Sequence, residues 1–375
     1  AFPWQAPPNP LLQHKQVIED NGVTRHKAVF HDALMDLFTD HTIQGRCLFP
    51  GAGFVEMALA AAVAAVRSGG QMSNAAVTLH EVAFREPLDL EVGSALVCEV
   101  PADGRDVEFR PAGEPDHVVC SVGRVTHESS LGSTPPSSLS ESRTRCADEV
   151  LGILERYADL RERGYHGPQF QTLSQVWRSA SGDEVVARLR VPAALSSERY
   201  HVHPAVLDGV FQLVGFCDLA QAASGKVWVP AGIKSLKMDR GSRLTQADPH
   251  DPDSVDEWMW ASARLVKSSA RVQIVDMAVY DASAGGVGLS VEGFRYGALK
   301  PEPPAVALYD VRWPEVKAEE SRTALVQDLS SLGRVVVFET PGSSTTLVSA
   351  LVEGMMASGV NCTSAAFAGL ENDDV

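Results

Sequence analysis

The chain has 375 residues, of which 45% are hydrophobic, so it is long enough for two domain-sized units and a remainder. Its formal net charge of −16 argues against general binding to nucleic acid or to an anionic membrane, because both attract a basic surface. The six cysteines form no C-x2-C pair and the most apolar run, 55–66, is too short to cross a bilayer. We therefore expect a cytoplasmic protein without a disulfide framework, a cysteine metal cluster or a membrane span.

The first half predicts one helix followed by an antiparallel sheet. Residues 1–15 are rich in proline and predict an extended linker, and 23–38 predicts short strands and turns. Residues 51–67 predict a helix whose many alanines suit close wrapping by a sheet. The strand-like runs that follow, separated by Pro and Gly turns, are 77–90, 94–100, 107–110 and 117–126.

The second half predicts the same order of elements. The Ser- and Pro-rich stretch 129–142 predicts a linker, and 147–163 predicts a helix. A second long helix is expected from His203-Pro204 to about residue 223. A sheet curled around one central helix, twice over, accounts for this repeat. The strand-like runs of this half are 173–179, 184–191, 227–239, 257–267, 271–280 and 287–299.

The last part of the chain changes character. Residues 324–332 and 345–357 predict helices, and 334–339 predicts a buried strand, which is the start of an alternating α/β unit. Both ends of the chain look like cuts within a longer polypeptide. The patterns together predict an α+β protein with the segments 1–140, 141–300 and 301–375.

The segment 40–56, DHTIQGRCLFPGAGFVE, has the composition of a site. His41, Gly45 and Pro50 form an H-x3-G-x4-P pattern just ahead of the first helix. If that helix begins within 51–54, its first N–H groups could hold a carbonyl that develops negative charge. A lone histidine beside a helix is more often a satisfied polar group, so this pattern leaves both interpretations open.

Asp208 lies at the equivalent place in the second half, within HPAVLDGVFQ. An aspartate near a helix start often only complements the dipole, but this apolar setting predicts desolvation and a raised pKa, which suits a proton donor. Gln212 follows at i+4, where it could orient the carboxyl group or simply be exposed. With His41, Asp208 would suit proton abstraction beside a carbonyl and protonation of a leaving hydroxyl. Cys47 is a weaker candidate, since its apolar neighbours favour packing.

These stretches carry a resemblance to a known family. DHTIQGRCLFPGAGFVEMAL resembles the first signature of polyketide synthase dehydratase domains, and HPAVLDGVFQ resembles their second. GYHGPQFQ is similar to the intervening glycine-proline motif, with His166 where a Tyr commonly precedes Gly-Pro. Pro10-Leu11-Leu12 is similar to the opening element, with Asn9 where the family usually has His. Residues from Leu308 onward are similar to the linker and first strands of the structural part of a ketoreductase domain.

The resemblance, which covers roughly residues 9–299, implies a double-hotdog fold: two antiparallel sheets, each wrapped round a central helix, here followed by a short C-terminal α/β fragment. It implies His41 as base and Asp208 as acid, supported by Gln212, in the loss of water from a β-hydroxyacyl thioester. We expect supporting or substrate-binding roles for Gly45, Pro50, Gly51, Gly53, Tyr165, His166, Gly167, Pro168, Phe170, His203 and Pro204.

The resemblance also implies partners. The substrate would arrive on an acyl carrier protein through phosphopantetheine, with no metal and no intrinsic cofactor. Neighbouring synthase domains and a second copy of the chain are the other expected partners. A double-bond isomerase or cyclase that uses the same residues, and a non-catalytic double hotdog, are the alternatives.

Overall fold

The computed structural model describes residues 9–18, 22–68, 76–128, 138–191, 200–217, 228–247, 257–282, 286–298, 334–339 and 361–366, with Glu353 and Met356. The chain forms two compact units, Ala1–Pro301 and Glu302–Val375. Among the described residues, no helix is both long and apolar enough to cross a membrane. The division of the chain at residue 140 stays a prediction.

The N-terminal half of the first unit is a sheet packed on α2 (Gly51–Ser68). Helix α2 contacts three of its strands, β5, β6 and β8. Its residues 52–63 are buried, and the many alanines among them let the helix axis lie close to the sheet. The strands run in the order β1 (His14–Ile18), β2 (Val23–Val29), β6 (Ala95–Val100), β7 (Arg105–Pro111), β8 (Cys120–Glu128) and β5 (Ala76–Phe84).

The C-terminal half repeats this arrangement around α6 (Pro204–Phe211) and the short α7 (Val214–Cys217). Both helices contact β11 and β14. The strands run in the order β12 (Trp228–Met238), β16 (Val287–Ala298), β15 (Val272–Tyr280), β14 (Glu257–Ser268), β11 (Glu184–Val191), β10 (Leu173–Arg178) and β9 (Asp148–Glu149), with β13 (Gln246–Ala247) paired to β14. The predicted double hotdog is therefore confirmed.

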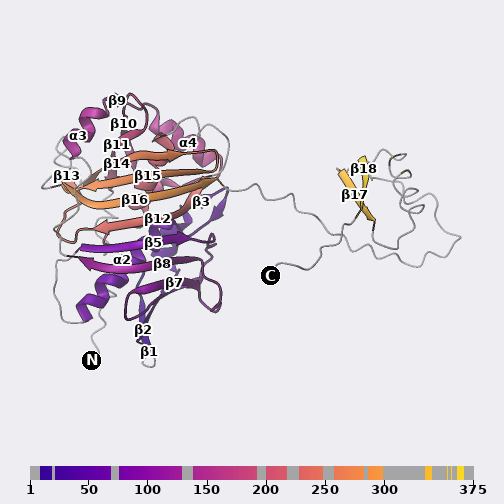
Figure 1. Cartoon of the computed structure of the whole chain (residues 1–375), viewed down its shortest axis with the longest axis horizontal. Helices are drawn as coiled ribbons and strands as arrows, with labels where there is room; N and C mark the ends of the chain where they lie inside the picture. Colours follow the sequence, from indigo (N-terminus) through magenta and orange to yellow (C-terminus); the bar gives the residue numbers. More distant parts are fainter. Residues whose placement is uncertain are drawn as a thin grey trace. The chain divides into compact units, whose positions relative to one another are not determined.

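The two halves share one sheet. Strand β5 pairs with β12 in antiparallel register, with Leu79 opposite Leu236 and Val77 opposite Met238. Figure 1 shows the two strands side by side, with β5 in purple next to β12 in salmon pink. The pairing also brings α2 into contact with α6. The two expected sheets are thus continuous, and the central helices of both halves touch.

The second unit contains a parallel pair of strands, β17 (Arg334–Glu339) and β18 (Asn361–Ala366). Strand β17 confirms the strand predicted there. Parallel pairing requires a crossover between the strands, as in an alternating α/β unit. The helix predicted at 324–332 lies outside the described residues, and so does most of that at 345–357.

Some elements of the N-terminal half differ from their predictions. The expected linker is wrong for its described part, because Leu11 and Leu12 are buried in the core and β1 begins at His14. The turns expected up to residue 38 are wrong for α1 (Asp32–Thr39), which buries Leu34, Met35, Leu37 and Phe38. A helix of two turns is too short to show a helical period in the sequence.

Helix boundaries differ in the C-terminal half. The linker expected to residue 142 already contains the start of α3 (Leu139–Arg145), which a capping box of Ser138 and Glu141 begins. Residues 147–163 include β9 before the shorter α4 (Ile153–Glu162). The long helix expected to residue 223 is wrong within the described residues: α6 ends at Phe211, and the Leu213 N–H then donates to the Val210 carbonyl, three residues back. Residues 218–223 lie outside the described part.

Glu56 of α2 links the first helix to the start of the second. Its carboxyl group, fully buried, accepts the side-chain amide of Asn9 at 2.7 Å and the backbone N–H groups of His201 and Val202 at 2.8 and 3.0 Å. His203 follows and caps α6, its Nδ1 accepting the Ala205 N–H. Burial raises the pKa of Glu56 to about 8, although the three N–H donors act in the opposite direction. The motif in residues 40–56 did not predict that Glu56 links the two helices.

Glu56 should make stability depend on pH. Its pKa rises from 4.5 to about 8 on folding, because the folded chain holds the carboxyl proton more tightly than the unfolded chain does. The protonated side chain therefore contributes fully to the free energy of unfolding below about pH 4.5, and this contribution is lost as the pH rises through about 8. We expect the wild-type chain to lose stability between about pH 6 and pH 8.5 relative to Glu56→Gln, by on the order of a few kcal/mol. Unfolding midpoints of both proteins at the two pH values measure this. Parallel pH profiles would contradict it.

Candidate active site

A cavity of about 250 Å³ opens where α2 meets α6. Its apolar wall includes Phe49, Phe54, Phe84, Phe211 and Tyr296. Residues of both halves therefore enclose one space. The predicted site residues that line it are His41, Gly51, Tyr165, His166, Asp208 and Gln212.

The His41 ring is held in one tautomer. This residue lies between α1 and β3 (Thr42–Ile43), and 5% of its surface is exposed. Its Nδ1 lies 2.6 Å from the carbonyl oxygen of Leu48. Because a carbonyl can only accept, Nδ1 carries the proton of the neutral ring and Nε2 keeps a lone pair. Nε2 lies 3.8 Å from Asp208 Oδ1, so the lone pair of a base faces a carboxyl group from the other half.

Gln212 holds the Asp208 carboxyl group. Its Nε2 donates to Asp208 Oδ2 at 2.8 Å and to the Phe170 carbonyl at 3.0 Å. Its Oε1 accepts the Tyr157 hydroxyl at 2.8 Å, and that hydroxyl accepts the Leu173 N–H at 3.2 Å. Each polar atom of the amide has a partner, so its orientation is set by the network. Sequence reasoning missed Tyr157, which carries no motif signal. The raised pKa expected for Asp208 stays a prediction.

The glycine-proline loop between α4 and η1 (Pro168–Phe170) docks against the first motif. Asp40 accepts two of its N–H groups, from Gly167 at the backbone carbonyl (2.6 Å) and from Gln169 at Oδ2 (2.9 Å). The Gly45 N–H donates to the Gly164 carbonyl at 2.9 Å. Gly45 and Gly164 both have positive φ, +79° and +78°, which glycine adopts without strain.

The docked loop places His166 in the cavity. Its ring stacks on that of His41, with centroids 5.1 Å apart and planes 29° apart. Its Nε2 lies 4.0 Å from Asp208 Oδ2. Burial lowers the pKa of His166 to about 4, against a smaller opposing effect of Asp208, so the ring is neutral near pH 7. The structure therefore places His166, which was expected only to support or bind substrate, directly beside His41 and Asp208.

Several predicted site residues support the cavity without lining it. The Pro50 carbonyl accepts the N–H groups of Gly53 at 2.9 Å and Phe54 at 3.4 Å. The oxyanion donors expected at the helix start stay a prediction. The N–H groups of Gly53 and Phe54 already bond to Pro50, and Gly51 lines the cavity together with the Phe54 side chain. A Cβ at Gly53 would lie 2.6 Å from the Phe49 ring, so this position needs glycine. Outside the cavity lining are Gly45, Pro50, Gly53, Gly167, Pro168 and Phe170.

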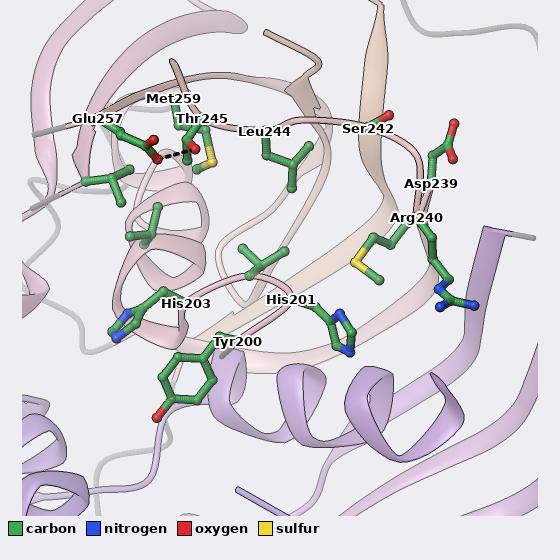
Figure 2. Close-up of a pocket in the computed structure, with 14 residues that line it drawn as sticks. Tyr200, His201, His203, Asp239, Arg240, Ser242, Leu244, Thr245, Glu257 and Met259 are labelled. Carbon is green, nitrogen blue, oxygen red and sulfur yellow. Dashed lines mark hydrogen bonds between the residues drawn. The ribbon is translucent and has the colours of Figure 1, made fainter. Parts of the chain in front are cut away.

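His203 and Pro204 also lie outside this cavity. His203 lines a separate cavity of about 320 Å³ in the C-terminal half, with Tyr200, Arg240 and Glu257 (Figure 2). The His203 ring contacts Tyr200 edge-on, with centroids 4.8 Å apart. Its Nδ1 caps α6, the helix of Asp208, and a supporting or substrate-binding role for His203 stays a prediction. Pro204 occupies the first turn of α6, where a missing N–H costs nothing.

Cys47 is a packed thiol. Its Sγ donates to the Phe38 carbonyl at 3.2 Å, and burial raises its pKa above the usual value. Both observations disfavour a thiolate nucleophile. This agrees with the packing role that its neighbours predicted.

A continuous sheet wrapped around two central helices defines a double-hotdog protein, and a histidine of one half faces an aspartate of the other. The family model described as polyketide synthase dehydratase domain matches residues 9–110. The model described as polyketide synthase dehydratase N-terminal domain matches residues 134–305. The chain therefore belongs to the polyketide synthase dehydratase family.

Relatives and solved structures agree with this family. The chain is 29% identical over 230 residues to the phenolphthiocerol synthesis polyketide synthase type I Pks15/1 of Mycobacterium marinum, covering 56% of this chain and 10% of that protein. It is 31% identical over 207 residues to the mycoketide-CoA synthase of Mycobacterium tuberculosis, covering 53% of this chain and 5% of that protein. The chain thus spans a tenth or less of the length of these relatives.

The fold is shared with solved dehydratase domains. That from the CurF module of curacin polyketide synthase has a TM-score of 0.62 at 22% identity, covering 78% of this chain and 99% of that one. CurK dehydratase in an inactive histidine-to-phenylalanine form has a TM-score of 0.62 at 18% identity, covering 79% and 100%. At these identities the likeness concerns the fold.

Gly167 is a sensitive point of the docked loop. A Cβ there would lie 2.3 Å from Asp40 Oδ1, whereas nothing lies within 4 Å of a Cβ at Gly215 in α7. We expect Gly167→Ala to lower the free energy of unfolding by about 1–3 kcal/mol, because the loop must shift. The control Gly215→Ala should be neutral or stabilising by up to about 1 kcal/mol. Denaturant titration of both measures this, and equal stabilities would show that the loop tolerates the methyl group.

Proposed function

We propose that this chain is the dehydratase unit of a multidomain polyketide synthase and removes water from a β-hydroxyacyl thioester to give the α,β-unsaturated acyl thioester. The observation that carries this proposal is the separation of 3.8 Å between His41 Nε2 and Asp208 Oδ1 in one cavity. A base and an acid at this spacing can address neighbouring carbon atoms of one substrate.

The reaction follows from the two side chains. His41 Nε2, with its free lone pair, removes the α-proton, and the electrons of that C–H bond form the Cα=Cβ double bond. The Cβ–O bond breaks with its electrons going to oxygen. Asp208, in its carboxylic acid form, gives its proton to that oxygen, which leaves as water. Proton transfer from the His41 imidazolium to the Asp208 carboxylate, through a water molecule, restores the starting state.

The start of α2 is suited to the thioester carbonyl. Gly51 lines the cavity at the N-terminus of an 18-residue helix, where the dipole is positive. We propose that its N–H donates to the carbonyl oxygen as negative charge develops during α-proton removal. A Cβ at Gly51 would lie 3.2 Å from the Phe84 ring, so glycine keeps that aromatic wall close.

Two further observations support the acid–base pair. Gln212 and Tyr157 hold Asp208 in place, which suits a carboxyl group that must meet a substrate oxygen. Among solved relatives, CurK dehydratase is inactive as a histidine-to-phenylalanine mutant and as an aspartate-to-asparagine mutant. We infer that His41 and Asp208 have the corresponding roles here.

The substrate and partners belong to the same proposal. We propose an acyl carrier protein whose phosphopantetheine brings the thioester, in the cytoplasm, with neighbouring synthase domains and a second copy of the chain as further partners. The cavity lining includes the cation Arg85, which suits an acidic carrier, whereas the Arg46 guanidinium already pairs with Asp89 at 2.6 Å and Glu86 adds a negative charge. The proposed reaction requires no metal and no redox cofactor, because base and acid are both side chains.

The alternative enzymatic functions proposed for this cavity would give products different from that of dehydration. An isomerase or cyclase would also use His41 as base, but its product keeps the oxygen atom. A non-catalytic double hotdog is disfavoured by an open cavity at the pair and by the network that holds Asp208.

We expect His41→Ala and Asp208→Asn each to lower kcat for dehydration by at least roughly 10²-fold, because each removes a proton-transfer group. The assay uses a β-hydroxybutyryl N-acetylcysteamine thioester, with mass spectrometry of the product. Loss of one water by the wild-type chain distinguishes dehydration from isomerisation. Wild-type rates in either variant, with an unchanged unfolding midpoint, would rule out the assigned pair.

A further inference from the structure

Two histidine rings face opposite oxygens of one carboxyl group. His41 Nε2 lies 3.8 Å from Asp208 Oδ1, and His166 Nε2 lies 4.0 Å from Asp208 Oδ2. The rings stack at 5.1 Å. The proposed mechanism uses only one of them. Whether His166 can donate or accept a hydrogen bond in the cavity depends on which ring nitrogen carries its proton.

The environment of the two Nδ1 atoms differs. His41 Nδ1 donates to the Leu48 carbonyl, which leaves Nε2 as an acceptor. His166 Nδ1 is buried and has no hydrogen-bond partner among the described residues. A proton on that atom would be a buried donor without an acceptor, which is unfavourable. The proton of neutral His166 is therefore better placed on Nε2, which faces the cavity. The two stacked rings then have opposite tautomers.

The gap beside Asp208 has room for a substrate oxygen. A separation of 4.0 Å between His166 Nε2 and Asp208 Oδ2 is too long for a direct hydrogen bond. One oxygen atom between them can lie about 2.8 Å from each. Such an oxygen can accept the His166 N–H while it receives a proton from Asp208.

We propose that His166 is a third catalytic residue, whose Nε2–H donates a hydrogen bond to the oxygen of the departing β-hydroxyl group. This inference rests on the proposed dehydratase function. His166 keeps its proton throughout, and the proton that completes the water comes from Asp208. The hydrogen bond strengthens as the Cβ–O bond breaks, because the oxygen gains negative charge.

A metal site is the other chemistry that this cluster suggests. His41, His166 and Asp208 offer ligand atoms within 4.8 Å of one another. A metal bound at Nε2 of both histidines requires both protons on Nδ1, and ligating histidines usually donate that N–H to an oxygen. His41 meets this requirement through Leu48, but His166 has no such acceptor among the described residues. The same observation that favours a donor at Nε2 thus disfavours a metal ligand.

The tautomers can be measured without substrate. Two-bond ¹H–¹⁵N spectra of the histidine rings in the whole chain, assigned with His41→Gln and His166→Gln, should show His41 protonated at Nδ1 and His166 protonated at Nε2 near pH 7. A proton on Nδ1 of His166, or a doubly protonated ring, would overturn the proposal.

Kinetics of a matched pair test the catalytic role. Glutamine can place an amide N–H near the position of Nε2, whereas leucine has a similar size and no donor. We expect His166→Leu to lower kcat by roughly 10- to 100-fold with a smaller change in KM, and His166→Gln to retain most of the activity. His14→Leu, at an exposed residue of β1, is the control and should match the wild type.

The outcomes separate this proposal from the one it rests on. A wild-type chain that dehydrates no thioester contradicts the dehydratase function itself. An active wild type with an equally active His166→Leu contradicts only the role of His166. Equal losses in His166→Leu and His166→Gln, with unchanged unfolding midpoints, would likewise exclude a hydrogen-bond donor.

Discussion

The antiparallel pairing of β5 with β12 is the contact on which the rest of the first unit depends. It merges two sheets into one, and each sheet positions its own central helix, so the register of this pair sets how α2 and α6 meet. Shifting β5 by one residue against β12 would turn Leu79 away from the core face on which Leu236 lies. The candidate active-site cavity lies where the helices meet. The geometry of the proposed chemistry is therefore a consequence of strand pairing.

Hydrogen bonds of polar side chains between the elements fix the arrangement around the cavity. Glu56 connects α2 to the residues that begin α6, and Gln212 connects Asp208 to Tyr157 and Phe170. Glu56 is fully buried and Gln212 is half-buried beside the cavity, so losing a hydrogen-bond partner is costly and keeping all partners gives one arrangement. The Asp208 carboxyl group is held from its own helix, from α4 and from the glycine-proline loop. This suits an acid that must meet a substrate oxygen within a few tenths of an ångström.

The two histidines show how identical side chains acquire different properties. His41 has a carbonyl acceptor at Nδ1, and His166 has none among the described residues. This difference of one oxygen atom makes one ring suitable as a base and the other as a donor. The stacking that brings them together depends on Asp40, which binds the loop of His166 through two N–H groups.

The sequence by itself determined the order of elements, the repeat of helix and sheet, and the motif residues His41, Asp208 and Gln212, because local period and residue type are written along the chain. Only the tertiary structure decided that His41 and Asp208 lie 3.8 Å apart, although 167 positions separate them in the chain. The tertiary structure alone also shows what Tyr157, Glu56 and His166 contact. It places His203 in the lining of a separate cavity. Such contacts depend on strand register, loop docking and the end of α6 at Phe211, which arise from interactions between distant residues and leave no local pattern.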